Sequence, residues 1–283
     1  MEQRSQQSLL RDYGIKPVKK RGQNFLVDGN LARSIAQDTL ALGDRVLELG
    51  AGGGALTTHL LTGAKHVVCV EVDRHLCALL RSEFGELNNF ELVEADLAKL
   101  DWFETVKLTS GRPVIAGNLP YVLTSKVLFA LAELRDVTSG AVFMVQKEVA
   151  ERMVATPGTK SFGILAAVLG AVFEMNIIRT VPSSVFWPKP DVESAIVSLV
   201  PKSDTLEPWP DDEFQTYRQT VKTLFGQRRK KLRNQLRHHY QLNGEEVDAM
   251  GVQLGLDLER RPEQCSVADF RIIARTLAAR ENS

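Results

Sequence analysis

The sequence predicts an α/β fold in which a Rossmann-like, mainly parallel sheet is followed by a small all-helical domain. Between about residues 30 and 200, short apolar runs alternate with stretches of helical periodicity, as in βαβ units with right-handed crossovers. After a segment rich in proline and acidic residues, 201–213, only helical periodicity remains. We therefore expect a Rossmann-like domain over residues 1–204 and a helical domain over residues 205–283.

Each expected strand is a short apolar run that leads into a turn or a helical stretch. The first, Arg45–Leu49, ends at a cluster of glycines, and the last can lie antiparallel at the end of the sheet. The expected strands cover residues 45–49, 66–71, 90–94, 113–116, 141–145 and 192–200. The expected helices lie around residues 56–61, 76–84, 122–131 and 149–153, and then over residues 214–240, 245–254 and 267–279.

Composition excludes several classes of protein. The chain has 283 residues, with 44% hydrophobic and 25% charged residues, which excludes a disordered, collagen-like or coiled-coil chain. Three scattered cysteines are too few for a disulfide framework or a zinc site, and they favour a reducing compartment. With no apolar signal segment and no run of about 18 apolar residues, we expect a cytoplasmic protein without a membrane span. We also expect a monomer without a metal site.

A glycine-rich turn followed by an acidic residue predicts a cofactor that contains adenosine. Ligands of open parallel sheets bind at the carboxyl ends of the strands, and Glu48–Ala55 lies at such an end. Glycines there let the backbone turn sharply and approach a ligand. Glu71 ends the next strand, where its carboxylate can accept hydrogen bonds from both hydroxyls of a ribose. The spacing Gly50-x-Gly52-x-x-Ala55 also fits a dinucleotide fingerprint, so a nicotinamide cofactor stays open, as does a purely structural turn.

Two further features favour S-adenosylmethionine. Asp96 follows the third strand, where a carboxylate can accept a hydrogen bond from the adenine amino group, although Asp is also a common helix N-cap. The second feature is the tetrapeptide Asn118-Leu119-Pro120-Tyr121 after the fourth strand, for which nicotinamide enzymes have no use.

The chemistry of this tetrapeptide suits the exocyclic amine of a nucleobase. The amine is a poor nucleophile, and hydrogen bonds to the Asn118 side-chain oxygen and the Leu119 carbonyl would draw its nitrogen toward tetrahedral geometry. Pro120 stiffens the turn, and the Tyr121 ring offers a stacking face. No general base is needed because a sulfonium leaving group is already activated. Alignment alone can supply roughly 7–11 kcal/mol. An ordinary Asn-x-Pro turn is the alternative interpretation.

With these motifs in place, nearly the whole chain resembles the ribosomal RNA adenine dimethyltransferase family. Gly22–Asp28 looks like the N-terminal signature of that family, and Phe186–Ala195 looks like its Phe-x-Pro-x-Pro-x-Val-x-Ser segment. Gln146–Ala150 with Arg152 matches a third stretch. The most similar branch is the housekeeping one, which implies dimethylation of two adjacent adenines near the 3′ end of small-subunit ribosomal RNA. The implied partner is this RNA or the immature small subunit, with the target adenines turned out of the stack.

The resemblance also implies roles for individual residues. Asn24 and Leu26 would contact the methionine end of the cofactor, and Asn118 would lie near both the methyl group and the target amine. Implied cofactor-binding residues are Asn24, Leu26, Gly50, Glu71 (ribose), Asp96 (adenine) and Asn118. Implied catalytic residues are Asn118, Leu119, Pro120, Tyr121 and Phe186, with the target adenine between the rings of Tyr121 and Phe186.

Departures from the family pattern are small. Ala51 stands where the family often has proline, and Leu119 replaces a proline that is common among adenine methyltransferases. Ala51 costs some rigidity but should not alter function. The change at Leu119 should be mild, because only the carbonyl of this residue is used. Without the resemblance, Phe186 would be interpreted as a core residue.

The net charge of zero conceals two basic segments. Residues 1–23 hold six basic and two acidic residues (+4), and residues 215–244 hold eight basic and none acidic (+8), so the remainder totals −12. A charge run is usually a solvated face, but two runs that flank a base-binding site favour phosphate contacts. RNA contacts are predicted for Arg228, Arg229, Lys230, Lys231 and Arg233.

Three alternatives remain open. A large-subunit RNA adenine methyltransferase of the macrolide-resistance type would share the cofactor motifs. The protein could also act chiefly as an assembly factor that docks on immature small subunits. A nicotinamide oxidoreductase would be stabilised by NAD, whereas a methyltransferase would be stabilised by S-adenosylmethionine or its demethylated product.

Overall fold

The computed structural model divides into two compact units, and each is described by itself. The first unit comprises residues 1–150 and 173–201, and the second comprises residues 151–172 and 202–283. The structure describes the whole chain except residues 1–5, 19–22, 203–208 and 282–283.

The predicted boundary between residues 204 and 205 falls outside the described residues, so it remains a prediction. The predicted basic segment 1–23 is described only in part, and Gly22 of the N-terminal motif also lies outside the described residues. The sequence did not indicate that residues 151–172, which precede a strand of the sheet, belong with the helical unit.

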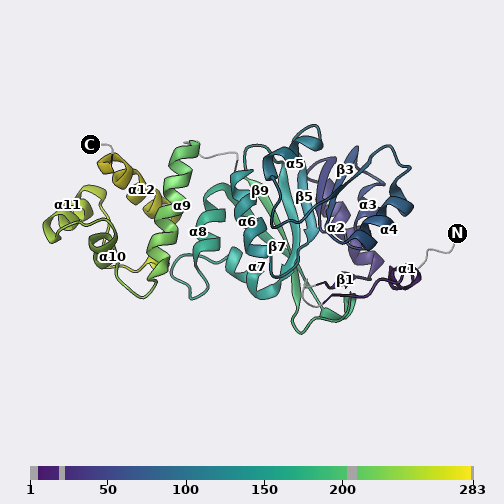
Figure 1. Ribbon diagram of the computed structural model, residues 1–283. Helices are drawn as coiled ribbons and strands as arrows, with labels where there is room; N and C mark the ends of the chain where they lie inside the picture. The colour runs from purple at the N-terminus through teal and green to yellow at the C-terminus, as the bar shows by residue number, and fades with distance from the viewer. Residues whose placement is uncertain (1–5, 19–22, 203–208, 282–283) are drawn as a thin grey trace. The chain divides into compact units, whose positions relative to one another are not determined.

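The first unit is built on a seven-stranded sheet in the order β4-β3-β2-β5-β6-β9-β7 (Figure 1). β2 to β6 are parallel to one another, whereas β9 is antiparallel to both of its neighbours. The strands are β2 (Arg45–Leu49), β3 (His66–Glu71), β4 (Phe90–Glu94), β5 (Val114–Asn118), β6 (Gly140–Gln146), β7 (Phe173–Val181) and β9 (Ser194–Pro201). A separate two-stranded sheet pairs β1 (Phe25–Leu26) with β8 (Phe186–Trp187).

All six predicted strands form, and the last is antiparallel as expected, but its predicted place at the end of the sheet is wrong. β9 lies between β6 and β7, and β7 forms the edge. The sequence signal for β7 is weak because most of its residues are exposed or half-buried. A bulge between Ile177 and Arg179 also breaks the alternation of apolar and polar residues.

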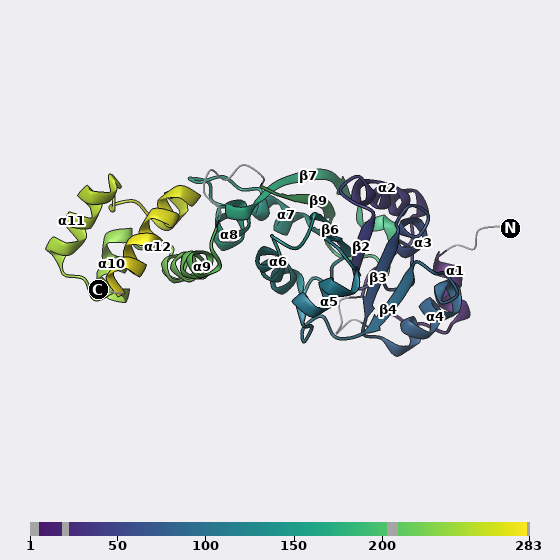
Figure 2. The same cartoon turned by 90° about the horizontal axis from the view of Figure 1, so that it is seen from above.

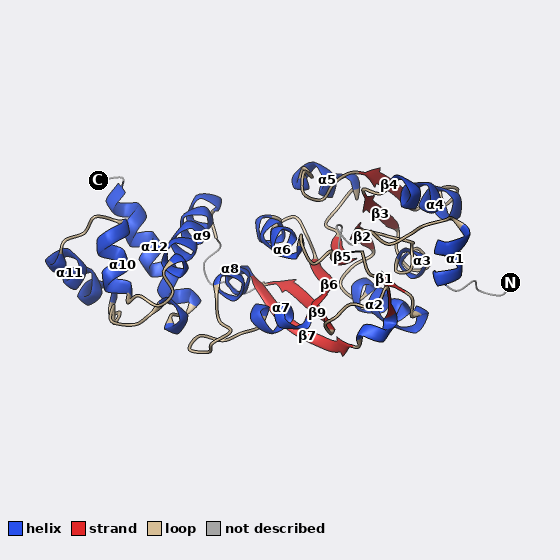
Figure 3. Ribbon diagram, turned by 60° about the horizontal axis from the view of Figure 1, so that its bottom comes forward, coloured by secondary structure: helices blue, strands red, loops and turns tan. Residues whose placement is uncertain are grey.

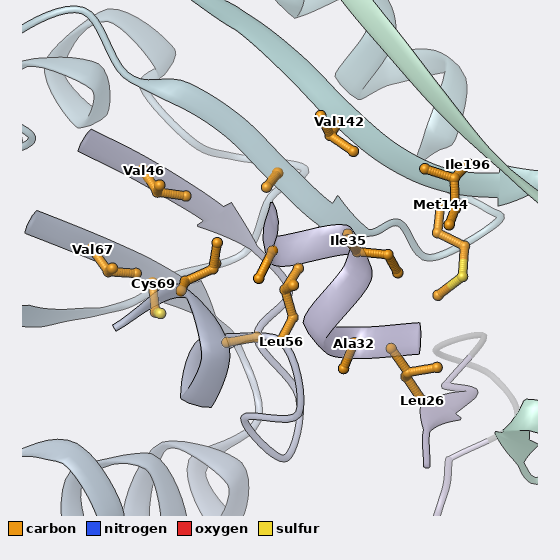
Figure 4. Packing of buried hydrophobic residues seen from close by; sticks show 14 of the residues in the cluster. Leu26, Ala32, Ile35, Val46, Leu56, Val67, Cys69, Val142, Met144 and Ile196 are labelled. Atoms are coloured by element: carbon orange, nitrogen blue, oxygen red, sulfur yellow. The ribbon is translucent and has the colours of Figure 1, made fainter. Parts of the chain in front are cut away.

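Helices cover both faces of the sheet, with α2 and α3 on one face and α5 and α6 on the other (Figure 3). The apolar core on the α2 side includes Ile35, Val46, Leu56, Val67 and Met144 (Figure 4). The helices are α1 (Gln6–Asp12), α2 (Gly29–Leu40), α3 (Thr57–Leu60), α4 (Arg74–Phe84), α5 (Trp102–Leu108), α6 (Thr124–Glu133) and α7 (Lys147–Met153), with a 3-10 turn at Ser183–Val185.

The second unit is helical, but the single helix predicted over residues 214–240 is wrong. α9 ends at Gly226, and Gln227–Lys231 form a turn before α10 begins. The turn is stabilised by another segment, because the amides of Leu232 and Arg233 donate to the carbonyls of Arg260 and Leu258 (both 2.9 Å). Its helices are α8 (Ile164–Val172), α9 (Asp211–Gly226), α10 (Leu232–His239), α11 (Gly244–Leu254) and α12 (Val267–Glu281), with a 3-10 turn at Pro262–Gln264.

Nowhere in the described part of the chain is there a helix long and apolar enough to cross a membrane.

Candidate active site

Two loops meet where the winding of the sheet reverses. From β2 the chain proceeds outward to β3 and β4, and it then returns to β5, which pairs with the other side of β2. Loops at the carboxyl ends of β2 and β5 therefore lead in opposite directions and leave a crevice, where ligands of open α/β sheets bind. The glycine turn follows β2, and the Asn118–Tyr121 motif begins at the last residue of β5.

A cavity lies at this crevice and is lined by both loops and by the segment around β1. Five apolar lining residues, Leu26, Ile35, Ala51, Leu56 and Met144, belong to the core cluster, so the cavity adjoins the core. Figure 4 labels four of them, Leu26, Ile35, Leu56 and Met144. The structure brings together seven of the predicted site residues in the lining: Asn24, Leu26, Gly50, Asn118, Leu119, Pro120 and Tyr121.

The glycine turn has the conformation that the sequence predicted. Gly50 (φ +70°) and Gly52 (φ +56°) adopt left-handed backbone conformations that other residues rarely take. A Cβ atom at Gly50 would contact only Cδ of Pro120, at 3.8 Å, so the space beside Gly50 opens into the cavity. Gly117, which sequence reasoning did not single out, is needed for packing, because a Cβ there would overlap the carbonyl oxygen of Leu49.

Glu71 lies outside the cavity lining but is hydrogen-bonded to the turn that forms it. Its Oε2 accepts from the Gly52 amide (2.9 Å), and its Oε1 accepts from the amides of Val72 (2.8 Å) and Asp73 (2.9 Å). Burial raises the pKa of this carboxyl. Since each carboxylate oxygen can accept two hydrogen bonds, these contacts leave one acceptor position, on Oε2, for a ribose hydroxyl. Ribose binding by Glu71 remains a prediction.

Asp96 and Phe186 also lie outside the cavity lining. Asp96 is half-buried in a turn, where its Oδ1 accepts from the amide of Ala98 (2.8 Å), and no helix begins there. Phe186 is buried, pairs with Leu26 in the small sheet and packs in the core cluster. The core position suggested by the sequence alone is thus present, while contact of Phe186 with a base stays a prediction.

The Asn118–Tyr121 motif presents two acceptors. The Asn118 Nδ2 donates to the carbonyl of Asn24 (2.8 Å), which orients the side-chain amide and leaves Oδ1 as the acceptor. Within the described chain, neither this Oδ1 nor the Leu119 carbonyl accepts a hydrogen bond. The Leu119 amide donates to the carbonyl of Met144 (3.1 Å), which anchors the motif to β6. The Tyr121 hydroxyl lies 3.2 Å from Oγ of Ser194, which fixes the orientation of the tyrosine ring.

Sequence reasoning assigned no role to Glu48, which lines the cavity from the end of β2. Its Oε2 accepts from the Thr57 hydroxyl (2.7 Å) and from Sγ of Cys69 (3.3 Å). Burial, together with the charge of Glu71, raises the pKa of Glu48 to about 7, although the hydrogen bonds from Thr57 and Cys69 act to lower it. The available signal was an acidic residue within an otherwise apolar strand, directly before the glycine turn.

The five predicted RNA-contact residues are in the second unit and differ in their surroundings. Arg229 and Lys230 are exposed in the turn between α9 and α10, and no salt bridge joins them to another described residue. The other three form salt bridges: Arg228 with Glu263 (2.5 Å), Lys231 with Glu259 (2.6 Å), and Arg233 with Asp248 (2.9 Å) and Glu259 (3.6 Å). The charge count of this segment therefore overstates the charge available for phosphate.

Known proteins match this chain over most of its length. Relatives called ribosomal RNA small subunit methyltransferase A include one from Prosthecochloris aestuarii, 39% identical over 92% of this chain and 93% of that protein. Another, from Clostridioides difficile, is 33% identical over 97% of this chain and 96% of that protein.

Solved structures share the fold. A dimethyladenosine transferase from Plasmodium falciparum has a TM-score of 0.69 at 24% identity, and covers 88% of this chain and 96% of that one. The 23S rRNA methyltransferase ErmE has a TM-score of 0.66 at 23% identity, and the match covers 90% of this chain and 100% of that one. The model of the family described as ribosomal RNA adenine dimethylase matches residues 16–279. The chain belongs to this ribosomal RNA adenine dimethylase family of S-adenosylmethionine-dependent methyltransferases.

Proposed function

We propose that the protein dimethylates N6 of two adjacent adenines in a loop near the 3′ end of small-subunit ribosomal RNA. It would act as a monomer on the immature small subunit, in the cytoplasm. The observation that carries the proposal is a pair of acceptors in the lining of the cavity, Asn118 Oδ1 and the Leu119 carbonyl, which accept no hydrogen bond from the described residues. The small-subunit relatives, at 33% and 39% identity, support this RNA over large-subunit RNA.

The cavity fits S-adenosylmethionine in its chemistry. The open space beside Gly50 would fill if this residue had a side chain, which is the arrangement expected where a ligand passes close to the backbone. The carboxyls of Glu48 and Glu71 put acceptors beside the turn for hydroxyl or ammonium groups. We assign Asn24, Leu26, Gly50, Glu71, Asp96 and Asn118 to cofactor binding. When bound, this cofactor supplies a methyl group on a sulfonium, a leaving group that needs no acid.

The residues of the chain act by alignment. Asn118 Oδ1 and the Leu119 carbonyl would each accept a hydrogen bond from the target amine and so orient the nitrogen lone pair toward the methyl group. Tyr121, with its hydroxyl bonded to Ser194, would stack on the adenine, and Phe186 would complete the adenine site. The methylated amine can release its proton to water, so no side chain has to act as a base. Pro120 keeps the turn rigid.

Access to the cavity requires a flipped or unpaired base. The acceptors lie at the end of β5 within the first unit, where an adenine stacked inside a duplex cannot reach them. Phosphate contacts from Arg228, Arg229, Lys230, Lys231 and Arg233 would hold the RNA. The largest share would come from Arg229 and Lys230, which form no salt bridge with another described residue.

Mass spectrometry of ribosomal RNA tests the proposal. Unmethylated small subunits and, in parallel, large subunits would be incubated with the protein and S-adenosylmethionine, and the modified nucleotides would then be located. We expect two adjacent dimethyladenosines in small-subunit RNA and no change in large-subunit RNA. Modification of large-subunit RNA alone would favour the macrolide-resistance type. Binding to small subunits without methyl transfer would favour an assembly factor.

A further inference from the structure

We propose that Gln6, on the N-terminal helix α1, is a binding residue of the methyl-donor cavity. Its side-chain Oε1 would accept a hydrogen bond from an amine or hydroxyl of the donor. The inference rests on the proposed function, because it takes this cavity as the S-adenosylmethionine site. No sequence motif pointed to α1, which precedes the first family signature by some distance along the chain.

The contacts of the Gln6 amide support the role. Gln6 lines the cavity, and its Nε2 donates to the carbonyl of Gly53 in the glycine turn (2.5 Å). This hydrogen bond determines which end of the amide is the nitrogen. The Oε1 accepts no hydrogen bond from the part of the chain that the structure describes. A polar acceptor is thereby left at the wall of a cavity whose predicted ligand carries several donors.

α1 is anchored, so Gln6 is presented from a defined position. Leu10 is fully buried in a small cluster with Ile15, Phe25, Leu76 and Leu79. Just after the helix, the Tyr13 hydroxyl donates to Oγ of Ser82 on α4 (2.9 Å), and Figure 2 shows α1 beside α4. The binding contact comes from the side-chain amide of Gln6 and does not depend on the backbone at the end of this short helix.

Gly53 supplies an independent observation. Unlike Gly50 and Gly52, it does not have a positive φ, so its backbone does not require glycine. A Cβ at this position would instead overlap Nε2 of Gln6 and Cδ2 of Leu10. The absence of a side chain at residue 53 therefore lets α1 approach the turn closely enough for Gln6 to reach the cavity.

Binding of S-adenosylhomocysteine to the full-length protein tests the inference by isothermal titration calorimetry. Gln6→Ala removes the amide, and Gln6→Met keeps the length and apolar packing of the side chain without polar atoms. Gln7→Ala is the matched control, since Gln7 is the same residue type on the same helix but does not line the cavity. We expect both Gln6 variants to raise the Kd about fivefold to tenfold, the range of one lost hydrogen bond, and Gln7→Ala to leave it unchanged.

Each outcome decides the matter. An unchanged Kd in Gln6→Met overturns the inference, even if Gln6→Ala weakens binding, because loss of helix packing then explains the effect. Equal weakening by the Gln7 control also overturns it. Failure of the proposed function is distinguishable, since the wild-type protein would then not bind S-adenosylhomocysteine or would not methylate small subunits.

Discussion

The carboxyl edge of the sheet and the basic turn of the helical unit use polar groups in different ways. At the sheet edge, Glu71 and Asn118 are hydrogen-bonded to backbone groups, and these bonds orient the atoms that remain for a ligand. In the basic turn, Gln227–Lys231, and at the start of α10, Lys231 and Arg233 are joined to exposed acidic side chains. No salt bridge joins the neighbouring Arg229 and Lys230 to another described residue. A sequence motif can thus indicate a site whose side chains are oriented by hydrogen bonds to the backbone. A count of charged residues, in contrast, does not show which cations are available to bind phosphate.

The largest expected effect is at the sheet edge. Asn118→Ala removes the oriented acceptor, and we expect single-turnover methyl transfer to fall about 100-fold, because misplacement of a reacting group costs that much. Binding to small subunits should persist, as measured by co-sedimentation. Asn176→Ala, on the exposed edge strand β7, is the control and should retain full activity. Activity of Asn118→Ala within a few fold of wild type would contradict the role of this residue.

The next effect is on the pH dependence of the free energy of unfolding, which should differ between the buried carboxyl of Glu48 and the exposed carboxyl of Glu259. The pKa of Glu48 is about 7 in the folded protein, compared with the ordinary value of 4.5 expected in the unfolded chain. Between these pH values the folded protein therefore retains a proton that the unfolded chain has lost. The wild type should therefore lose free energy of unfolding as pH rises from 4.5 through 7. Glu48→Gln abolishes this loss, so between pH 5 and pH 8 the free energy of unfolding of the variant should rise by roughly 2–3 kcal/mol relative to that of the wild type.

Denaturant unfolding at both pH values measures the difference between Glu48→Gln and wild type. The exposed Glu259, whose pKa is lowered by its hydrogen bond to Lys231, provides the control, since Glu259→Gln should not gain stability with rising pH. A constant difference between the Glu48 variant and wild type would show that Glu48 is ionised in the folded protein at pH 5.

The smallest effect is on the salt dependence of RNA affinity, and it tests whether cations held by acidic side chains contribute less to RNA binding than their neighbours. Arg229→Ala/Lys230→Ala and Lys231→Ala/Arg233→Ala each remove two positive charges, but only the second pair is held by acidic side chains. We expect the first double variant to reduce the slope of log affinity against log salt by about 2, and the second to leave it near wild type. RNA affinity measured from about 50 to 200 mM salt provides the slopes. Equal slopes in the two variants would show that the internal salt bridges open on RNA binding.

Much of the fold followed from local pattern, and the misses have physical causes. β2 and β3 form over the predicted residues because strands that are buried at nearly every position need mostly apolar side chains. The half-buried edge strand β4 also has its predicted bounds. β7 was missed because an edge strand with a bulge lacks that pattern. The turn at Gln227–Lys231 was missed because its amino acids favour a helix, and contacts from the Leu258–Arg260 segment override that preference.

In the candidate site, too, some features could be predicted from local sequence and others depended on tertiary contacts. Sequence alone indicated the glycine turn, Glu71 and the Asn118–Tyr121 motif, because glycines and acceptor side chains that recur together at the carboxyl ends of parallel strands are typical of a ligand site. The burial of Phe186 agrees with the interpretation from sequence alone, but only the tertiary structure brought Gln6 to Gly53 and placed Glu48 in the cavity wall. These depend on contacts between segments distant in the chain, and packing at such contacts is decided by shape in three dimensions, which no local pattern of residues records.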